Sequence, residues 1–432
     1  MKGDFTRDTF HRSRDFYRVL LQQGRVQIDA DWNEQIAILL DRFEKLVVDV
    51  FGEHGGAQES CGFAVFRDKP GDLRLSKGRY YVEGVLCENN EITKLEPPQL
   101  DPDDEPKAYF AYLDVFEKFV AAAQDPSIAD SALGGLDTAA RTKISWAVKY
   151  WPLDDAANVE EKSSHEHWNR EWENVRFELL RRDERRGRLR AATRSASGYT
   201  GAQNQLYRIE IHQGGESSEN GGGATWKWSR ENGSIAFGIT NISAPAAGGP
   251  YEVDLRSGPQ AAGAFSLGEW VEIASDTVAE DAQTKPPLLR VASAPPQSGA
   301  SISLDASPGA YNSKAHQIVR RWDQKHDADG NDLAATGGCL PLVENAWLPV
   351  HDGITVYFHA PAGERVQYRG GDYWLVPARA ATSAIEWPSD GTESAALPPH
   401  GVRHRYAPLA GLAVRGERLH PEHDFRILRP PT

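Results

Sequence analysis

The chain has 432 residues, which is enough for two or three domains with cores of their own. It carries 62 acidic and 48 basic residues, so its charge does not favour a general nucleic-acid-binding protein. No apolar run approaches the roughly 18 residues that a membrane span requires, and membrane insertion is not expected. The three cysteines lie far apart, which predicts free thiols in a protein folded in the cytoplasm.

The first seventeen residues form a polar leader in which aromatic side chains stand among arginines. The leader has neither the apolar core nor the cleavage site of an export signal. It is typical of an arm that lies in a groove and is anchored by its rings, which are Phe5, Phe10, Phe16 and Tyr17. In residues 19–30, Val26 and Ile28 alternate with the polar residues Arg25, Gln27 and Asp29, which predicts a short, half-buried strand that leads into the helix.

A long amphipathic helix is predicted from Asp31 to Phe51. Asp31 and Glu34 have the spacing of a capping box, in which each side chain binds a backbone amide of the first turn. Apolar residues then recur at intervals of three and four, at Ile36, Leu39, Leu40, Phe43, Leu46, Val47 and Val50. Such a stripe must be covered, either by the chain's own sheets or by the same helix of another copy. The stripe covers about two heptads, fewer than the three or four that indicate a coiled coil.

Several blocks of the sequence resemble a known family. These blocks are residues 1–7, 22–35, 78–88, 133–143, 204–212, 226–234 and 371–379. They span nearly the whole chain and are similar to the signature of the uncharacterised bacterial DUF6519 family. Members of this family occur beside the baseplate genes of contractile, phage-tail-like injection systems. The resemblance therefore implies a component of such a particle.

The fold is expected to be mainly β (α+β), with antiparallel domains of the sandwich or barrel type, a long N-terminal helix and a helical insertion. Residues 1–56 form the arm and the helix that would anchor or oligomerise the protein, and residues 57–153 form a first β domain. Residues 154–197 are a charged helical insertion or linker, and residues 198–432 are a C-terminal β region. The last region could be two subdomains that divide near residues 310–345.

No metal or cofactor site is predicted. His165 and His167 are two residues apart in an expected helix, so their side chains diverge, and no further zinc ligands stand at a suitable spacing. Residues 323–332 resemble a calcium loop, but the spacing of their acidic residues is wrong. The arginines of residues 181–194 would suit either a basic groove for an anionic partner or a solvated helix.

Trp226 and Trp228 share one face of a predicted strand. If exposed, the two rings could stack on sugar rings; if buried, they would pack against a second sheet. The sequence contains no nucleophile elbow, phosphate-binding loop, dinucleotide fingerprint or zinc-protease motif, so an enzyme is not expected. A pair of carboxylates with glycoside hydrolase-like activity is the remaining enzymatic alternative.

These observations predict a non-enzymatic structural or accessory component of a contractile injection system, at the baseplate or in a fibre. The protein would be made and assembled in the cytoplasm, in a particle that can be released and act outside the cell. Its leader and helix would dock it to other particle subunits, with a homotrimer as one form and no nucleic acid as partner. Two alternatives are a cargo protein in the tube lumen, expected to be a monomer, and a glycan-binding module that uses Trp226 and Trp228.

Overall fold

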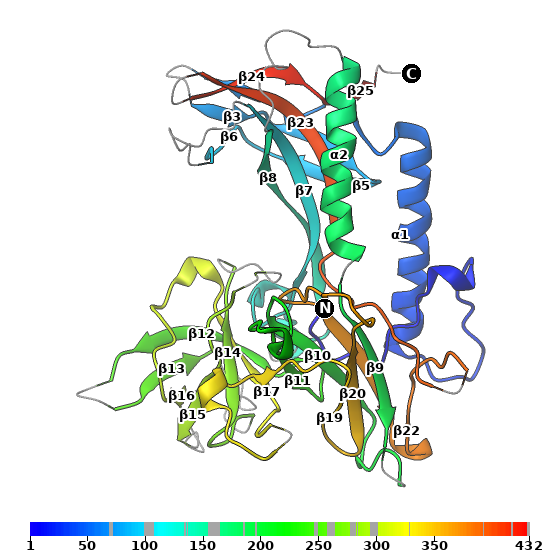
Figure 1. Cartoon of the computed structure of the whole chain (residues 1–432), viewed down its shortest axis with the longest axis vertical. Helices are drawn as coiled ribbons and strands as arrows, with labels where there is room; N and C mark the ends of the chain where they lie inside the picture. Colours follow the sequence, from blue (N-terminus) through cyan, green and yellow to red (C-terminus); the bar gives the residue numbers. More distant parts are fainter. Residues whose placement is uncertain are drawn as a thin grey trace.

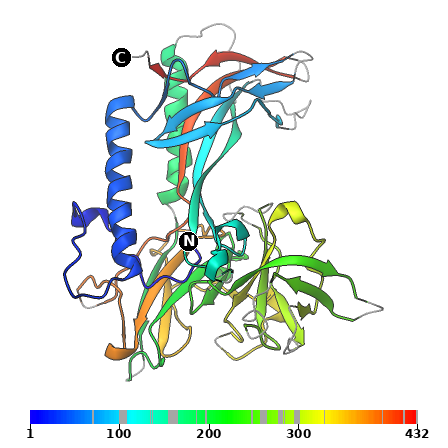
Figure 2. The same ribbon diagram turned by 180° about the vertical axis from the view of Figure 1, so that it is seen from behind.

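The computed structural model describes residues 1–68, 72–98, 108–133, 135, 137–153, 165–184, 186–194, 197–245, 249–256, 264–276, 282, 284–293, 301–327, 329–391, 393–415 and 418–429. The molecule has two lobes along its longest axis, and helix α1 (Asp29–Phe51) runs along one side of it (Figure 1, Figure 2). Antiparallel sheets dominate both lobes, which confirms the mainly β class.

The first lobe, drawn uppermost in Figure 1, is built on a long hairpin. Strands β7 (Ala108–Val120) and β8 (Arg141–Leu153) pair over their full length. They belong to a four-stranded sheet of order β24-β23-β7-β8. A second four-stranded sheet, made of shorter strands, has the order β25-β1-β4-β5, and a three-stranded sheet has the order β2-β3-β6. The smaller strands are β1 (His54–Ala57), β2 (Val65–Arg67), β3 (Leu73–Leu75), β4 (Gly78–Val82), β5 (Val85–Asn89) and β6 (Thr93–Lys94).

The last strands of the chain return to this first lobe. They are β23 (His404–Arg415), β24 (Arg418–Asp424) and β25 (Leu428–Arg429). β23 pairs with β7, and β25 pairs in parallel with β1. The predicted division had placed residues 404–429 with the C-terminal β region instead. Leu409 and Leu412 are fully buried in the core of the first lobe, so this return has a hydrophobic driving force.

Helix α2 (His165–Glu184) lies against the four-stranded sheet, which confirms a helix in the predicted insertion. Trp168 and Trp172 from α2 pack edge-to-face on Phe110 of β7, with ring centroids 5.3 and 5.9 Å apart. The arginines that follow are divided between the helix and the next strand, where Arg181 pairs with Glu178 and Arg190 with Glu393. Ion pairs therefore compensate these two of the described arginines of the stretch.

The second lobe consists of two sheets and a closed barrel. A five-stranded sheet has the order β18-β11-β10-β21-β22, a three-stranded sheet has the order β19-β20-β9, and six strands close a barrel of order β12-β13-β16-β15-β14-β17. The strands of the two sheets are β9 (Arg188–Thr193), β10 (Gln205–Gln213), β11 (Thr225–Ser229), β18 (Leu340–Pro341), β19 (Trp347–Pro349), β20 (Ile354–His359), β21 (Tyr373–Arg379) and β22 (Ala384–Ile385). The strands of the barrel are β12 (Ala236–Ser243), β13 (Tyr251–Leu255), β14 (Trp270–Ala274), β15 (Leu289–Ser293), β16 (Ser301–Leu304) and β17 (Ile318–Trp322).

Short 3-10 helices connect several of these elements. They are Arg12–Arg14, Pro126–Ile128, Ser131–Leu133, Ser218–Asn220, Ser313–Ala315, Ala334–Thr336 and Ala380–Thr382. The two sheets of the second lobe enclose an aromatic core that includes Tyr207, Trp226, Phe358 and Trp374. The barrel has a separate aliphatic core.

Helix α1 begins two residues earlier than predicted and without the capping box. Its N-cap residue is Ile28, whose side chain makes no capping hydrogen bond. The Asp29 carboxylate accepts hydrogen bonds from the amide and the hydroxyl of Thr6, at 3.0 and 2.6 Å. Glu34 accepts one from the Thr9 hydroxyl at 2.6 Å, so it is engaged by the leader.

The strand predicted in residues 19–30 was also wrong. Residues 19–28, all of them described, are irregular, and Val26 is 86% exposed. An alternating pattern produces a strand only where a neighbouring strand satisfies its backbone and covers its apolar face.

Candidate docking surface and buried ionic cluster

The first seven residues of the leader are fixed on the second lobe. Arg208 donates a hydrogen bond to the Met1 carbonyl at 3.0 Å, and Asn232 donates one to the Gly3 carbonyl at 2.9 Å. The Lys2 ammonium lies 3.3 Å from a carboxylate oxygen of the fully buried Glu210. This part of the leader is consequently a component of the second lobe.

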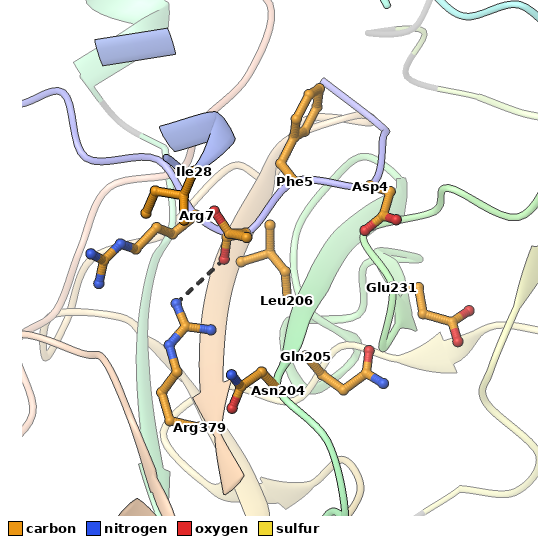
Figure 3. A pocket seen from close by; sticks show the side chains of 10 residues that line it. Asp4, Phe5, Arg7, Ile28, Asn204, Gln205, Leu206, Glu231 and Arg379 are labelled. Atoms are coloured by element: carbon orange, nitrogen blue, oxygen red, sulfur yellow. Dashed lines mark hydrogen bonds between the residues drawn. The ribbon is translucent and has the colours of Figure 1, made fainter. Parts of the chain in front are cut away.

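A hollow of about 260 Å³ lies beneath residues 4–7 (Figure 3). Arg379 reaches across it to the backbone carbonyl of Thr6, at 3.3 Å, and also pairs with Glu386. Arg7 binds the same Glu386 carboxylate at 3.1 Å. Because these groups are partly exposed, each pair contributes little to stability.

The four rings predicted to anchor the leader divide into two pairs. Phe5 and Phe10 are half-buried, and Phe5 packs edge-to-face on Phe119 with centroids 6.3 Å apart. Phe16 and Tyr17 are exposed, and the Arg42 guanidinium lies 4.8 Å from the Tyr17 ring centroid. Of the four rings, Phe16 and Tyr17 are the two that are mostly exposed.

One side of α1 attaches the helix to the first lobe. Ile38 is 2% exposed, and Arg405 from β23 donates to both carboxylate oxygens of Glu44, at 3.0 and 3.1 Å. Gly84 packs against the backbone of Glu44, where a Cβ atom would lie 2.4 Å from the carbonyl oxygen. The φ angle of Gly84 is +82°, so this close approach requires glycine.

The opposite side of α1 is apolar and uncovered, and we call it the outward face. It consists of Trp32, Ile36, Leu39, Phe43, Leu46 and Val50, and each is between 38% and 69% exposed. These residues follow one another at intervals of four and three in strict alternation. Their mean period of about 3.5 residues is that of the contact positions in a coiled coil. Leu40 is exposed beside the outward face and widens it.

The outward face is comparable in area to the largest apolar patch of a typical monomer. Taking roughly 200 Å² for each of the two aromatic side chains and roughly 120 Å² for each of the four aliphatic ones, the six side chains, each about half exposed, leave on the order of 500 Å² of apolar surface in water. The largest apolar patch of a typical monomer is about 300–600 Å², and a stable interface buries about 800 Å² on each partner. This area is therefore sufficient for most of one side of a protein interface.

The predicted helix residues are distributed between both sides of α1. Ile36, Leu39, Leu40, Phe43 and Val50 are exposed, whereas Val47 is buried against the first lobe. Sequence reasoning missed Trp32, which had been placed inside the capping box, and it left Leu46 out of the docking set. The strict alternation of intervals from residue 32 to residue 50 would have identified both.

The two tryptophans considered for sugar stacking are buried. Trp226 is 1% and Trp228 is 5% exposed. Trp226 donates a hydrogen bond to the Pro341 carbonyl at 3.2 Å and packs edge-to-face on Phe358. Neither ring has a face open to a sugar, so they serve the core between the two sheets of the second lobe.

Lys227, between these two tryptophans, begins a buried ionic cluster. We use this name for Lys2, Arg208, Glu210, Lys227, Glu272, Lys285 and Arg320. Lys227 is fully buried, lies 2.9 Å from a Glu272 oxygen and has its ammonium 4.1 Å from the centroid of the Trp322 ring. The alternation of the strand places Lys227 on the face opposite to the two tryptophans, and the barrel covers that face of β11.

The electrostatics of the cluster favour the charged carboxylates. Burial alone would raise the pKa of Glu210, but Lys2 and Arg208 outweigh this effect and hold that pKa well below its usual range. Burial lowers the pKa of Lys285 to about 8, against the opposing effect of Glu210. Burial, together with Lys227, lowers the pKa of His212 to about 3, so this imidazole is neutral at physiological pH.

Other candidate chemistry is limited within the described residues. No three His, Cys, Asp or Glu side chains converge there in a way that would hold a metal ion. Cys61, Cys87 and Cys339 are free, and burial raises the pKa of Cys87 and of Cys339 to about 12. Neither described helix has a stretch long and apolar enough to cross a bilayer.

The class that the fold and this surface define is a mainly β, two-lobed protein with an uncovered apolar helix face. The model of the family of unknown function DUF6519 matches residues 1–172 and 190–419, so the chain belongs to that family. The unmatched residues between these segments include the second half of α2 and the first two residues of β9. A comparison with curated proteins gave no match, and neither did a comparison with solved structures.

Proposed function

We propose that this protein is a non-enzymatic structural subunit of a contractile, phage-tail-like injection particle, at the baseplate or in a fibre. The observation that supports a docking role is the outward face of α1, because the largest apolar patch of a protein, which has about this area, is often functional. The type of assembly comes from the family resemblance, since related genes stand beside baseplate genes. The exposed rings Phe16 and Tyr17 extend the same surface.

We further propose that the outward face associates with copies of itself to form a homotrimer. Ile36, Phe43 and Val50 occupy one contact position of the heptad, and Trp32, Leu39 and Leu46 occupy the other. Leu40 adds a third apolar position on one flank, which is the wider pattern of helices in bundles. This width favours more than two helices around a common axis.

Light scattering after size exclusion tests this association. The purified chain at micromolar concentration should have the mass of three copies. The double variant Leu39→Glu/Phe43→Glu should be a monomer with an unchanged circular dichroism spectrum, because both side chains are exposed in the single chain. A wild-type protein that runs as a monomer would eliminate the trimer.

Particle association is a separate measurement. Particles purified from cells that carry the double variant should lack this subunit, whereas the wild-type chain should copurify with them. Removing residues 2–17 would be a poorer test, because it also removes Lys2 from the buried Glu210. A map of intact particles that shows the chain as a monomer inside the tube would instead support the cargo alternative.

A further inference from the structure

A cleft of about 620 Å³ lies between the end of the β7–β8 hairpin and the barrel, and the proposed docking role does not use it. Phe116 and Lys118 line it from β7, Ile273 lines it from β14, and Leu289 lines it from β15. This volume is within the range of small-molecule sites, which are mostly apolar with a few convergent polar groups.

The inner side of this cleft is formed by the buried ionic cluster. Lys2, Glu272, Lys285 and Arg320 all line the cleft, and the three cations are each at most 6% exposed. The whole cluster contains five cations and two carboxylates, Glu210 and Glu272. Among the described residues of the cluster positive charge is therefore in excess, and uncompensated charge is costly in a buried place.

Two of these cations have hydrogen-bonding capacity directed at the cleft. The Lys285 ammonium lies 4.0 Å from Glu210, which is beyond hydrogen-bond distance. The Arg320 guanidinium donates to the Gly233 carbonyl through Nε at 2.9 Å, while its Nη1 lies 4.0 Å from Glu272. Lys118, at the rim, is already paired with Asp276.

We propose that this cleft binds a small organic molecule with a phosphate monoester, whose dianionic head lies on Lys285 and Arg320. A dianion would compensate most of the excess charge, and the planar guanidinium of arginine matches phosphate oxygens. The organic part packs on the apolar wall that includes Phe116, Ile273 and Leu289. Three carboxylates, Glu117, Glu272 and Asp276, also line the cleft and repel a second acidic group, so the ligand carries one phosphate only.

Isothermal titration calorimetry of the full chain with inorganic phosphate and with phenyl phosphate tests this proposal, with sodium chloride at matched ionic strength as the blank. Both probes should bind saturably, and phenyl phosphate should bind at least tenfold more tightly because of the apolar wall. Absence of saturable binding of either probe up to about 10 mM would overturn the proposal. Equal affinities for the two probes would overturn the part of the proposal that places an organic group on the apolar wall.

Variants locate the site. Lys285→Met should weaken both probes at least tenfold, and the protein without ligand should unfold at the same temperature or higher, because an unmatched buried charge is removed. Lys94→Met, at an exposed lysine in β6 of the first lobe, is the matched control and should leave binding unchanged. Arg320→Lys keeps the charge but removes the planar group, and it should also weaken phosphate binding. Retention of full affinity in both Lys285→Met and Arg320→Lys would place the phosphate elsewhere.

Discussion

Two adjacent residues of α1, Ile38 and Leu39, should respond oppositely to substitution by alanine. Ile38 is 2% exposed and Leu39 is 54% exposed, so one is buried on the inner side of α1 and the other belongs to the outward face. Ile38→Ala should lower the free energy of unfolding by about 2–5 kcal/mol, as is usual for a buried large-to-small change. Leu39→Ala should lower it by about 1 kcal/mol or less, since roughly half of the side chain is in water already.

The effect on self-association should be reversed. Covering the exposed half of Leu39 in a trimer is worth about 1 kcal/mol per copy, or about 3 kcal/mol for three copies. Leu39→Ala should therefore lower the trimer formation constant about 100-fold, while Ile38→Ala leaves it unchanged. Alanine is a strong helix former, so loss of helix does not confound either variant.

Sedimentation equilibrium over a series of concentrations measures association, and urea unfolding at the most dilute concentration measures the stability of the single chain. Equal association constants for wild type and Leu39→Ala would refute the role of the outward face. So would an Ile38→Ala protein that stays folded and associates as poorly as Leu39→Ala.

Three further predictions concern the buried residues. Trp226→Ala should lower the free energy of unfolding, measured with urea, by about 3–5 kcal/mol, whereas Trp32→Ala, at an exposed residue, should lower it by less than about 1 kcal/mol. Equal losses in the two variants would contradict the packing described. Glu210→Gln should cost about 3–5 kcal/mol because it leaves five buried cations with one carboxylate, whereas the exposed Glu219→Gln should change stability by less than about 0.5 kcal/mol. The pKa of His212 is about 3 in the folded chain and near 6.5 in the unfolded chain. As the pH is lowered, the unfolded chain therefore binds the proton first. The free energy of unfolding should consequently fall between about pH 6.5 and pH 3. His212→Gln should flatten part of that slope in urea midpoints, and an unchanged slope would show that His212 does not cause it.

The periodicity of apolar residues predicted those helices and strands that are defined by neighbouring residues in the sequence. The α1 stripe and the strand around Trp226 were both evident from spacing alone. Residue spacing does not show which segment of the protein covers each face of a helix or strand. The apolar Leu39 is exposed because no described segment covers the outward face of α1. The charged Lys227 is buried because the barrel covers the polar side of β11.

Contacts between distant parts of the sequence account for the remaining errors. Asp31 and Glu34 have the spacing of a capping box, but the helix begins earlier, at Asp29, and Glu34 accepts a hydrogen bond from the Thr9 hydroxyl. Residues 404–429 continue a β-rich region without any break in composition, so nothing in them indicates a return to β7. The ionic cluster was equally invisible, since Lys2 and Glu210 are joined only when the leader docks.

The pairing of β23 with β7 also has a consequence for how the protein is made. About 290 residues separate Phe116 from its partner His404, so the central sheet of the first lobe is incomplete until β23 has been synthesised. The second lobe, whose described strands β9–β22 pair among themselves, can close earlier during synthesis. For that interval the free edge of β7 can capture a strand from a neighbouring nascent chain. Slow translation or high expression should therefore increase aggregation through the first lobe, and chaperones that shield strand edges should increase the yield.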